Sequence, residues 1–282
     1  MREAVLYKNL DNNNIQCQTC CHQCIIAPNK AGICGVRKNI NNKLYILNYG
    51  HVVAEQIDPI EKKPINNFLP HTYTYSFALA GCNFRCLHCQ NAEISQQLTV
   101  SSQQRLPMEI IKNAIKFKCT SISYTYTEPT VFLEYALDVM KLAHKKSLKN
   151  IWVSNGYFSE KTFNLIKKYL DAINIDLKSL SNKFYQEICG AKLQPVLDNL
   201  IKVYKSGIHL EITTLIIPGK NDNVKELKQL AEFIFNKLGP EVSWHVTKFY
   251  SMHKMMNIRQ ANHLDILKAV AIGQKVGLKN IY

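Results

Sequence analysis

The sequence contains no continuous run of the roughly 18 apolar residues that a membrane-spanning helix requires, so we expect no membrane span. Residues 1–9 lack the apolar core of a secretory signal peptide, so we expect a cytoplasmic protein. The chain also has no low-complexity tract and no internal repeat. Its 282 residues are 46% hydrophobic and 20% charged, which suits one large domain with a small additional region.

The chain has ten cysteines, and without an export signal they argue against a disulfide framework. The reducing cytosol instead favours thiols that stay free or bind metal. Five cysteines lie in residues 17–34 and three in residues 82–89. Cys119 and Cys189 stand apart, and we expect them to be core residues rather than ligands.

The formal net charge is +14, which raises the question of nucleic acid as a partner. The lysines are scattered, however, and pairs such as Lys145 and Lys146 are typical of solvated helix surfaces. We therefore expect no nucleic-acid partner. An enzyme that modifies RNA is kept as an alternative, with salt-sensitive RNA binding as its signature.

Two regions differ in composition. Residues 1–70 are predicted to form a cysteine-rich region with a β-hairpin, in which strands at 43–49 and 51–57 flank a turn at Gly50. Residues 71–282 alternate between strand and helix patterns and are predicted to form the core domain. Pro59, Pro64 and Pro70 mark the less regular connection between them.

The alternation in the core domain predicts a parallel sheet with helical crossovers. Six strand–helix units are fewer than the eight of a closed barrel, so we expect an α/β fold with a partial (β/α)6 barrel. In such a fold the chemistry gathers at the carboxyl ends of the strands. Strands are predicted at 74–80, 121–127, 151–154, 172–177, 210–217 and 242–249, and helices at 107–117, 130–146, 159–170, 182–206 with a break near Pro195, 223–238 and 263–276. Residues 279–282 are predicted to start a seventh strand.

The loop after the first predicted strand contains Cys82, Cys86 and Cys89, in Cys-x3-Cys-x2-Cys spacing. Three thiolates this close can ligate three irons of a [4Fe–4S] cluster, whose usual complement is four cysteines. No fourth cysteine follows nearby, so one iron stays open, and the amino and carboxylate groups of S-adenosylmethionine (SAM) fit it. Zinc is the alternative, but it usually takes four closed ligands. The spacing and its place after a strand favour the cluster.

This loop and several other segments resemble the radical SAM superfamily. More narrowly, the chain resembles the "AmmeMemoRadiSam system radical SAM enzyme" group, which is related to the pyruvate formate-lyase activating enzyme. The segments that carry the resemblance are GICGVR at 32–37, DPIEKKP at 58–64, GCNF at 81–84, CQN at 89–91, YTYTEPT at 124–130, SNGY at 154–157, NIDLK at 174–178 and WHV at 244–246.

The resemblance implies an enzyme that cleaves SAM with an electron from a separate donor. The resulting 5′-deoxyadenosyl radical would abstract hydrogen from a substrate that the sequence does not identify. A glycyl-radical protein, another protein and a small molecule stay open. A non-enzymatic iron–sulfur or zinc protein, which binds a partner or carries electrons, is the alternative from another class. Related chains often continue past the equivalent of Tyr282 with a short cysteine-containing tail, which this sequence does not show.

The resemblance also places cofactor contacts after the second strand. Thr127 and Glu128 stand where the superfamily usually has a Gly-Gly-Glu-like motif that binds the methionine amino group, although the glycines are missing here. The alternative for Glu128 is electrostatic support of the helix that starts at Pro129. Both roles are compatible.

Three further strand-end residues, Asn155, Asp176 and Lys178, correspond to positions near the ribose and methionine ends of the cofactor in activating-enzyme relatives. A surface ion pair is the alternative for Asp176 and Lys178. Val153 stands where those relatives often have Asp, so a cation site there is not expected. His88 precedes the third cysteine, where the superfamily often has an aromatic residue over the adenine. An imidazole can stack there, with a charge that depends on pH.

The N-terminal cysteines Cys17, Cys20, Cys24 and Cys34 have Cys-x2-Cys-x3-Cys-x9-Cys spacing. Four thiolates could close a structural zinc site or hold a second iron–sulfur cluster, and the spacing does not decide between them. Cys21 or His22 could replace one of the four.

Overall fold

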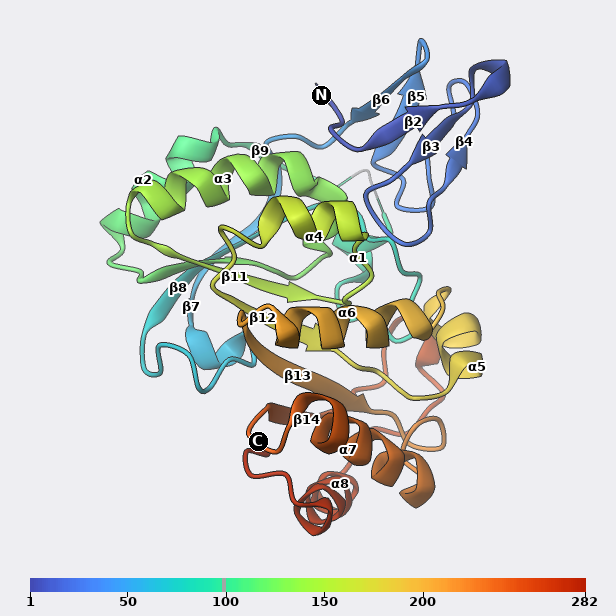
Figure 1. The fold of residues 1–282 in the computed structure, drawn as a ribbon, viewed down its shortest axis with the longest axis vertical. Coiled ribbons are helices and arrows are strands. Elements are labelled where there is room, and N and C mark those ends of the chain that lie inside the picture. Colours follow the sequence, from blue (N-terminus) through green and yellow to red (C-terminus); the bar gives the residue numbers. More distant parts are fainter. Residues whose placement is uncertain (98–99) are drawn as a thin grey trace.

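The computed structural model describes residues 1–97 and 100–282. Within these residues, an eight-stranded sheet has the order β14-β13-β12-β11-β10-β8-β7-β9 (Figure 1). From β8 to β14 the strands are parallel, whereas β7 and β9 pair antiparallel. The strands are β7 (His51–Pro59), β8 (Tyr73–Leu79), β9 (Gln103–Gln104), β10 (Ser121–Tyr124), β11 (Lys149–Ser154), β12 (Ala172–Asp176), β13 (His209–Ile216) and β14 (Ser243–Lys248).

Helices connect the parallel strands, as the crossovers of a parallel sheet require. The longer ones are α2 (Pro107–Lys116), α3 (Leu133–Lys145), α4 (Glu160–Ile166), α6 (Gln194–Lys205), α7 (Val224–Leu238) and α8 (His263–Val276). Shorter turns are η1 (Asp11–Asn13), η2 (Ile60–Lys62), α1 (Ala92–Ser95), η3 (Pro129–Phe132), α5 (Asn182–Phe184), the π-helical η4 (Tyr185–Cys189) and η5 (His253–Met255). In the described residues, no helix is long and apolar enough to cross a membrane.

The parallel strands are buried on both faces, because helices cover one face and the inward-facing side chains fill the other. All four residues of β10 are buried, and Trp152 on β11 and Trp244 on β14 are fully buried. The sheet stays open, since β14 and β9 are its edges. The predicted α/β fold with a partial (β/α)6 barrel is therefore confirmed, and we refer to the six parallel strands and their helices as the barrel.

One detail in the C-terminal half differs from the predictions, and two others agree with them. Residues 279–282 make a single parallel bridge, Ile281 to Trp244, rather than a described strand. The helical region at 182–206 is interrupted before Pro195, as predicted, with Gly190 in the left-handed region and α6 starting at Gln194. Ser159 caps α4, as predicted, by accepting a hydrogen bond from the Thr162 backbone.

Residues 1–46 form two three-stranded sheets, which lie at the upper end of the molecule in Figure 1. One has the order β1-β6-β5 and the other β2-β3-β4. Their strands are β1 (Arg2–Glu3), β2 (Tyr7–Asn9), β3 (Ile15–Cys17), β4 (Ile25–Ile26), β5 (Arg37–Ile40) and β6 (Lys43–Ile46). We refer to residues 1–46 as the appendage.

The predicted hairpin between residues 43–49 and 51–57 is wrong. Both segments contain a strand, but β6 pairs with β5 and β1, whereas β7 pairs with β8 of the large sheet. The actual hairpin joins β5 to β6 through Asn41 and Asn42, with φ of 50° and 59°. Asparagine tolerates this left-handed conformation, which two-residue hairpin turns need. The division into domains at about residue 70 stays a prediction.

The appendage is joined to the barrel by polar contacts. Arg37 of β5 forms a buried ion pair with Glu134 of α3, with 2.6 Å between Nη2 and Oε2. The backbone N–H of Cys21 donates to the Tyr157 carbonyl, and the Cys20 backbone forms an isolated antiparallel β-bridge with that of Phe158. These contacts hold the N-terminal cysteines against the loop that follows β11.

Candidate functional site

A cavity of about 550 Å³ opens at the carboxyl ends of the parallel strands. The predicted cluster and cofactor residues all line it, although they come from four separate strand ends. They are Cys82, Cys86, His88, Cys89, Thr127, Glu128, Asn155, Asp176 and Lys178. The structure thus brings together every residue that the sequence predicted for this site.

Where the cysteine loop follows β8, its backbone packs closely against the appendage. Gly81 has φ of 106°, and a Cβ there would lie 2.8 Å from a Val36 methyl group, so only glycine fits. Farther along, the backbone N–H groups of Arg85 and Leu87 donate to the carbonyls of Cys189 and Ile188. The loop is therefore held from both sides, and η4 supplies one of its walls.

The three thiols differ in their surroundings. Burial, followed by the Glu128 charge, raises the pKa of Cys82 well above its usual value. The neighbouring Cys189 thiol is hydrogen-bonded to Cys86 and lowers its pKa. Cys89 Sγ lies 3.1 Å from the Ser95 hydroxyl. The prediction that Cys189 is a core residue is confirmed, because its side chain is fully buried, but it also contacts a predicted ligand.

His88 lies in the cavity wall with its ring centre 6.4 Å from that of Phe184. Burial, followed by the positive charge of Lys178, lowers the pKa of His88 to about 3. The imidazole is therefore neutral near pH 7. Its Nδ1 is buried and has no hydrogen-bond partner among the described residues, and the same holds for Thr213 Oγ1 in this cavity. These unpaired polar atoms, together with three thiols, fit a polar cofactor bound beside a cluster.

Glu128 has a structural role, as the alternative interpretation expected. Its Oε1 accepts hydrogen bonds from the Thr130 N–H at 3.0 Å, the Thr130 hydroxyl at 2.6 Å and the Ser154 hydroxyl at 2.9 Å. Its Oε2 accepts from the Asn155 N–H at 2.9 Å. Burial raises the pKa of Glu128. The carboxyl group thus ties the second strand end to the third, and its contact with the cofactor stays a prediction.

Thr127 and Asn155 are also held in fixed positions. The Thr127 hydroxyl donates to the Leu79 carbonyl at 2.6 Å. The Asn155 side-chain amide donates to Asn83 Oδ1 at 2.7 Å, and its oxygen accepts from the Tyr157 N–H at 3.0 Å. Two neighbouring strand ends are therefore fixed relative to the cysteine loop.

Asp176 and Lys178 form a pair in the cavity wall rather than on the surface, with 2.9 Å between Oδ2 and Nζ. Burial lowers the pKa of Lys178, but the negative charge of the Asp176 carboxylate outweighs this effect and raises the Lys178 pKa well above its usual value. The cavity therefore contains a stable positive charge close to one predicted cluster ligand.

The sequence analysis missed a second charged group in the cavity. Lys62, Lys63 and Tyr126 line it and converge on Asp58, whose two oxygens bind both lysines and the tyrosine hydroxyl. Burial raises the pKa of Asp58, but the hydrogen bonds from the lysines outweigh this effect, so the Asp58 pKa lies below its usual value. The adjacent lysines in residues 58–64 were the available signal. Thr213, within β13, and Thr247 and Lys248, at the end of β14, were missed as well.

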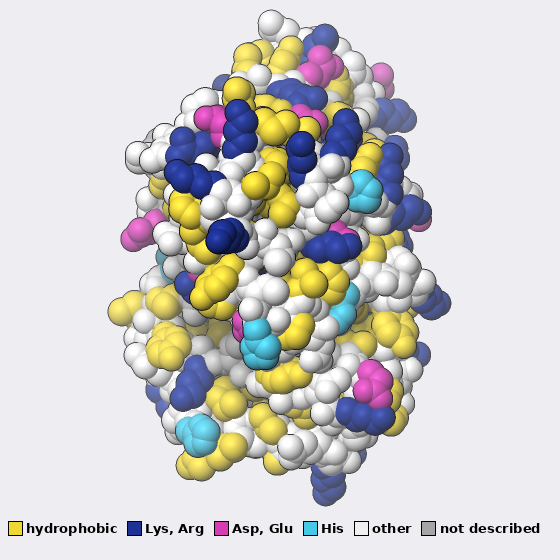
Figure 2. Space-filling model, turned by 90° about the vertical axis from the view of Figure 1, so that its left-hand side faces the viewer, with side chains coloured by type: hydrophobic (Ala, Val, Ile, Leu, Met, Phe, Trp, Pro, Cys, Tyr) yellow, Lys and Arg dark blue, Asp and Glu magenta, His cyan; other side chains and the backbone are white. Residues whose placement is uncertain are grey.

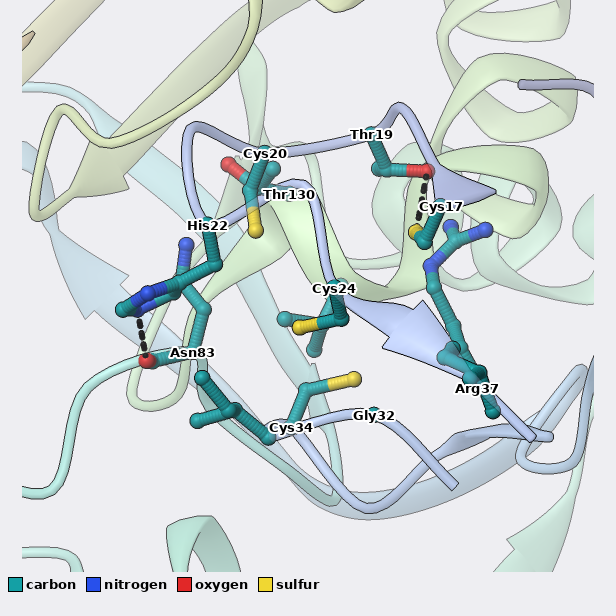
Figure 3. Close-up of a pocket in the computed structure, with 13 residues that line it drawn as sticks. Cys17, Thr19, Cys20, His22, Cys24, Gly32, Cys34, Arg37, Asn83 and Thr130 are labelled. Atoms are coloured by element: carbon teal, nitrogen blue, oxygen red, sulfur yellow. Dashed lines mark hydrogen bonds between the residues drawn. The ribbon is translucent and has the colours of Figure 1, made fainter. Parts of the chain in front are cut away.

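The four N-terminal cysteines Cys17, Cys20, Cys24 and Cys34 line one small enclosed pocket between the appendage and the barrel (Figure 3). Cys21 does not line it, since its thiol donates to the Phe158 carbonyl at 3.1 Å. Throughout the described part of the chain, no group of three or more His, Cys, Asp or Glu side chains is arranged to hold a single metal ion.

A family model described as the radical SAM superfamily matches residues 78–234. The chain belongs to this superfamily. Among its relatives, the protein MJ0808 of Methanocaldococcus jannaschii is 40% identical, over all of this chain and 84% of that protein. The pyruvate formate-lyase-activating enzyme of Clostridium pasteurianum is 23% identical, over 66% of this chain and 82% of that enzyme.

Solved structures show the same fold. A radical SAM methyltransferase from Sphaerobacter thermophilus matches with a TM-score of 0.59 and 12% identity, over 76% of this chain and 67% of that one. SuiB of Streptococcus suis, bound to SAM, matches with a TM-score of 0.55 and 14% identity, over 71% of this chain and 47% of that one.

Radical SAM enzymes use a [4Fe–4S] cluster to cleave SAM reductively to a 5′-deoxyadenosyl radical, and this chain is such an enzyme. The prediction of a radical enzyme with these two cofactors is confirmed. The alternative of a non-enzymatic metal protein is set aside.

Proposed function

We propose that Cys82, Cys86 and Cys89 hold the [4Fe–4S] cluster and that SAM occupies the cavity beside them. The observation that carries this is the convergence of the three thiols and all the predicted cofactor residues on one cavity. When bound, cluster and SAM supply the radical that abstracts a hydrogen atom from the substrate. The chain itself holds these groups in the cavity.

The polar side chains of the cavity have distinct proposed roles. Lys178, kept charged by Asp176, binds the carboxylate of the methionine portion of SAM. Asn155, fixed by Asn83, faces the ribose. His88, neutral and unpaired at Nδ1, packs against the adenine. Thr127 and Glu128 shape the backbone at the second strand end, where the methionine amino group would lie.

We further propose a protein substrate and membership of the AmmeMemoRadiSam group. The support is the pyruvate formate-lyase-activating relative, whose match extends over 82% of that enzyme. Each turnover also requires an electron from an external donor.

RNA is less well supported as a substrate. On the one face that Figure 2 shows, the Lys and Arg side chains lie mainly in the upper half, among apolar and uncharged side chains and a few Asp and Glu, and they do not form one continuous stripe. The experiment below therefore distinguishes a protein substrate from an RNA substrate.

The test is anaerobic reconstitution with iron and sulfide, reduction by dithionite, and measurement of 5′-deoxyadenosine after addition of SAM. Fractions of a cell extract then separate the substrate classes. A protein substrate predicts that the dialysed protein fraction accelerates formation of 5′-deoxyadenosine and that ribonuclease has no effect. Stimulation by the low-molecular-weight filtrate, or its loss after ribonuclease treatment, would contradict a protein substrate.

A further inference from the structure

The pocket of the four N-terminal cysteines has features that a simple structural zinc site does not explain. Cys17, Cys20, Cys24 and Cys34 approach it from the appendage, and Figure 3 shows their side chains around one common space with Arg37 beside them. The barrel closes the other side with Asn83, Thr130 and Val131. A group bound here would lie between the appendage and the barrel.

Backbone N–H groups point at two of the thiols, from His22 to Cys20 and from Val36 to Cys34. Such N–H groups favour the deprotonated thiolate, which is the form that a metal centre binds.

Two buried donors face the pocket without a partner. The Arg37 side chain is 2% exposed, and Glu134 binds both of its terminal nitrogens, but Nε finds no partner in the described residues. Asn83 Nδ2 is likewise buried and unpaired within residues 1–97 and 100–282. Leaving a buried donor unpaired is unfavourable, so a bound group with exposed acceptor atoms is expected beside these two donors.

The spacing of the candidate ligands favours a cluster over one ion. Around a single zinc, four sulfurs at about 2.3 Å from the metal lie about 3.8 Å from each other. Among the described residues, no three candidate ligands gather in this way, either here or at Cys82, Cys86 and Cys89. In a cluster each thiolate binds a different iron, so the sulfurs stand farther apart. The inorganic sulfides would also accept hydrogen bonds from the two unpaired donors.

We propose that Cys17, Cys20, Cys24 and Cys34 hold a second iron–sulfur cluster with no open iron, and that Arg37 Nε and Asn83 Nδ2 donate hydrogen bonds to it. Four protein ligands leave no position for SAM, so this cluster carries electrons. It takes one electron from a low-potential donor of the ferredoxin or flavodoxin class. It then returns to its oxidised state as it passes that electron to the first cluster, with no bond made and no proton moved.

Asn83 connects the two sites. It follows Cys82 directly in the chain, and its Oδ1 accepts from Asn155 of the SAM cavity. Its backbone carbonyl is hydrogen-bonded to His22 of the appendage, at 2.8 Å from Nε2. The two pockets are thus separated by the loop backbone, which suits electron transfer between them. This relay rests on the proposed function of the first site, whereas the presence of the second cluster does not.

The first experiment isolates the second site without altering the appendage. The triple variant Cys82→Ala, Cys86→Ala and Cys89→Ala is reconstituted anaerobically with iron and sulfide, and in parallel with zinc. We expect about four irons and four sulfides per chain, with an electron paramagnetic resonance signal on reduction. About one zinc that iron does not displace, or less than one iron per chain, would overturn the proposal. Adding Cys20→Ser and Cys34→Ser must abolish the iron, whereas adding Cys119→Ala must not.

The second experiment tests the hydrogen bond from Asn83 in the same triple variant. Asn83→Asp keeps the oxygen that accepts from Asn155 but replaces the unpaired N–H group by a carboxylate oxygen. The reduction potential of the remaining cluster should fall, because a donor is lost and a negative charge is gained. An unchanged potential with unchanged iron content would remove Asn83 from the site.

The third experiment tests the relay in the enzyme with the first cluster intact. Formation of 5′-deoxyadenosine by the Cys20→Ser and Cys34→Ser variant should be lost with reduced flavodoxin but retained with dithionite. Equal flavodoxin-driven rates in this variant and the wild type would overturn the relay. Failure of the wild type with dithionite would instead overturn the proposed function, and the metal content of the triple variant would still decide the second cluster.

Discussion

The buried ion pair between Arg37 and Glu134 is expected to determine whether the appendage stays on the barrel. Their side chains are 2% and 1% exposed, with Nη2 and Oε2 2.6 Å apart and Nη1 and Oε1 3.1 Å apart. The Val5 N–H also donates to Glu134 Oε1 at 3.0 Å. Glu134→Gln keeps the shape of the side chain but leaves the Arg37 charge buried without its counterion.

Breaking a buried pair by neutralising one partner costs about 3–5 kcal/mol, because the other charge remains desolvated. The chain offers a matched control one helical turn away on α3. Asp138 pairs with Arg2, whose side chain is 45% exposed, so Asp138→Asn should cost about 0–1 kcal/mol. At about 1.4 kcal/mol per tenfold change, Glu134→Gln should raise the population with a detached appendage by roughly two to three and a half orders of magnitude.

The assay is limited proteolysis of the reconstituted protein under native conditions. Cleavage within residues 1–46 should follow the detached population when detachment and return are fast. We expect much faster cleavage in Glu134→Gln than in Asp138→Asn, with the barrel fragment intact in both. Similar cleavage rates for Glu134→Gln, Asp138→Asn and the wild type would refute the reasoning, and so would a variant whose barrel is cleaved first.

Burial raises the pKa of Glu211, but hydrogen bonds from His209 and His245 outweigh it and hold the pKa at about 2, below the ordinary 4.5. The resulting stability is present above pH 4.5 and is lost as the pH falls toward 2, at up to about 1.4 kcal/mol per pH unit. Glu211→Gln lacks this titrating group, so its free energy of unfolding should fall less steeply with decreasing pH, which acid unfolding followed by fluorescence measures. Gly156 has φ of 71°, and a Cβ there would lie 2.8 Å from a β12 methyl group. Gly156→Ala should therefore lower the melting temperature, and an unchanged melting temperature would contradict this. Lys178→Met removes the proposed charged hydrogen bond to SAM, so the affinity for SAM, measured by calorimetry, should fall about tenfold or more. An unchanged affinity would exclude the proposed contact.

The positions of the parallel strands in the chain could be predicted because each strand is a short apolar run between turn residues. The runs that became β8, β10, β11, β12, β13 and β14 are nearly continuous, as strands covered on both faces must be. Because parallel strands end at the same edge of the sheet, residues such as Asn155 and Lys178 could be predicted to meet near the cysteine loop.

The pairing of the N-terminal strands could not be predicted in the same way. Residues 51–57 form a good strand in any pairing, and its partner β8 is selected by contacts across the large sheet rather than by the turn at Gly50. The local signal for the true hairpin was present in Asn41 and Asn42, two residues that tolerate positive φ.

The charged group around Asp58 was missed for a related reason. Lys62 and Lys63 follow β7, whose antiparallel pairing places Pro59 beside Tyr73 at the amino end of β8, so they reach the cavity from the end opposite the cysteine loop. Spacing also left zinc and a cluster equally open at the N-terminal cysteines. The unpaired donors of Arg37 and Asn83, which become visible only after folding, are what favour the cluster.

The most direct measurement is the yield of 5′-deoxyadenosine from SAM under dithionite, in protein whose iron content is measured in the same sample. The wild type and Cys119→Ala should form it, whereas Cys86→Ala should lose the first cluster and the product together. A wild-type sample with its full iron content and no 5′-deoxyadenosine would contradict the assignment, as would a Cys86→Ala sample that still cleaves SAM.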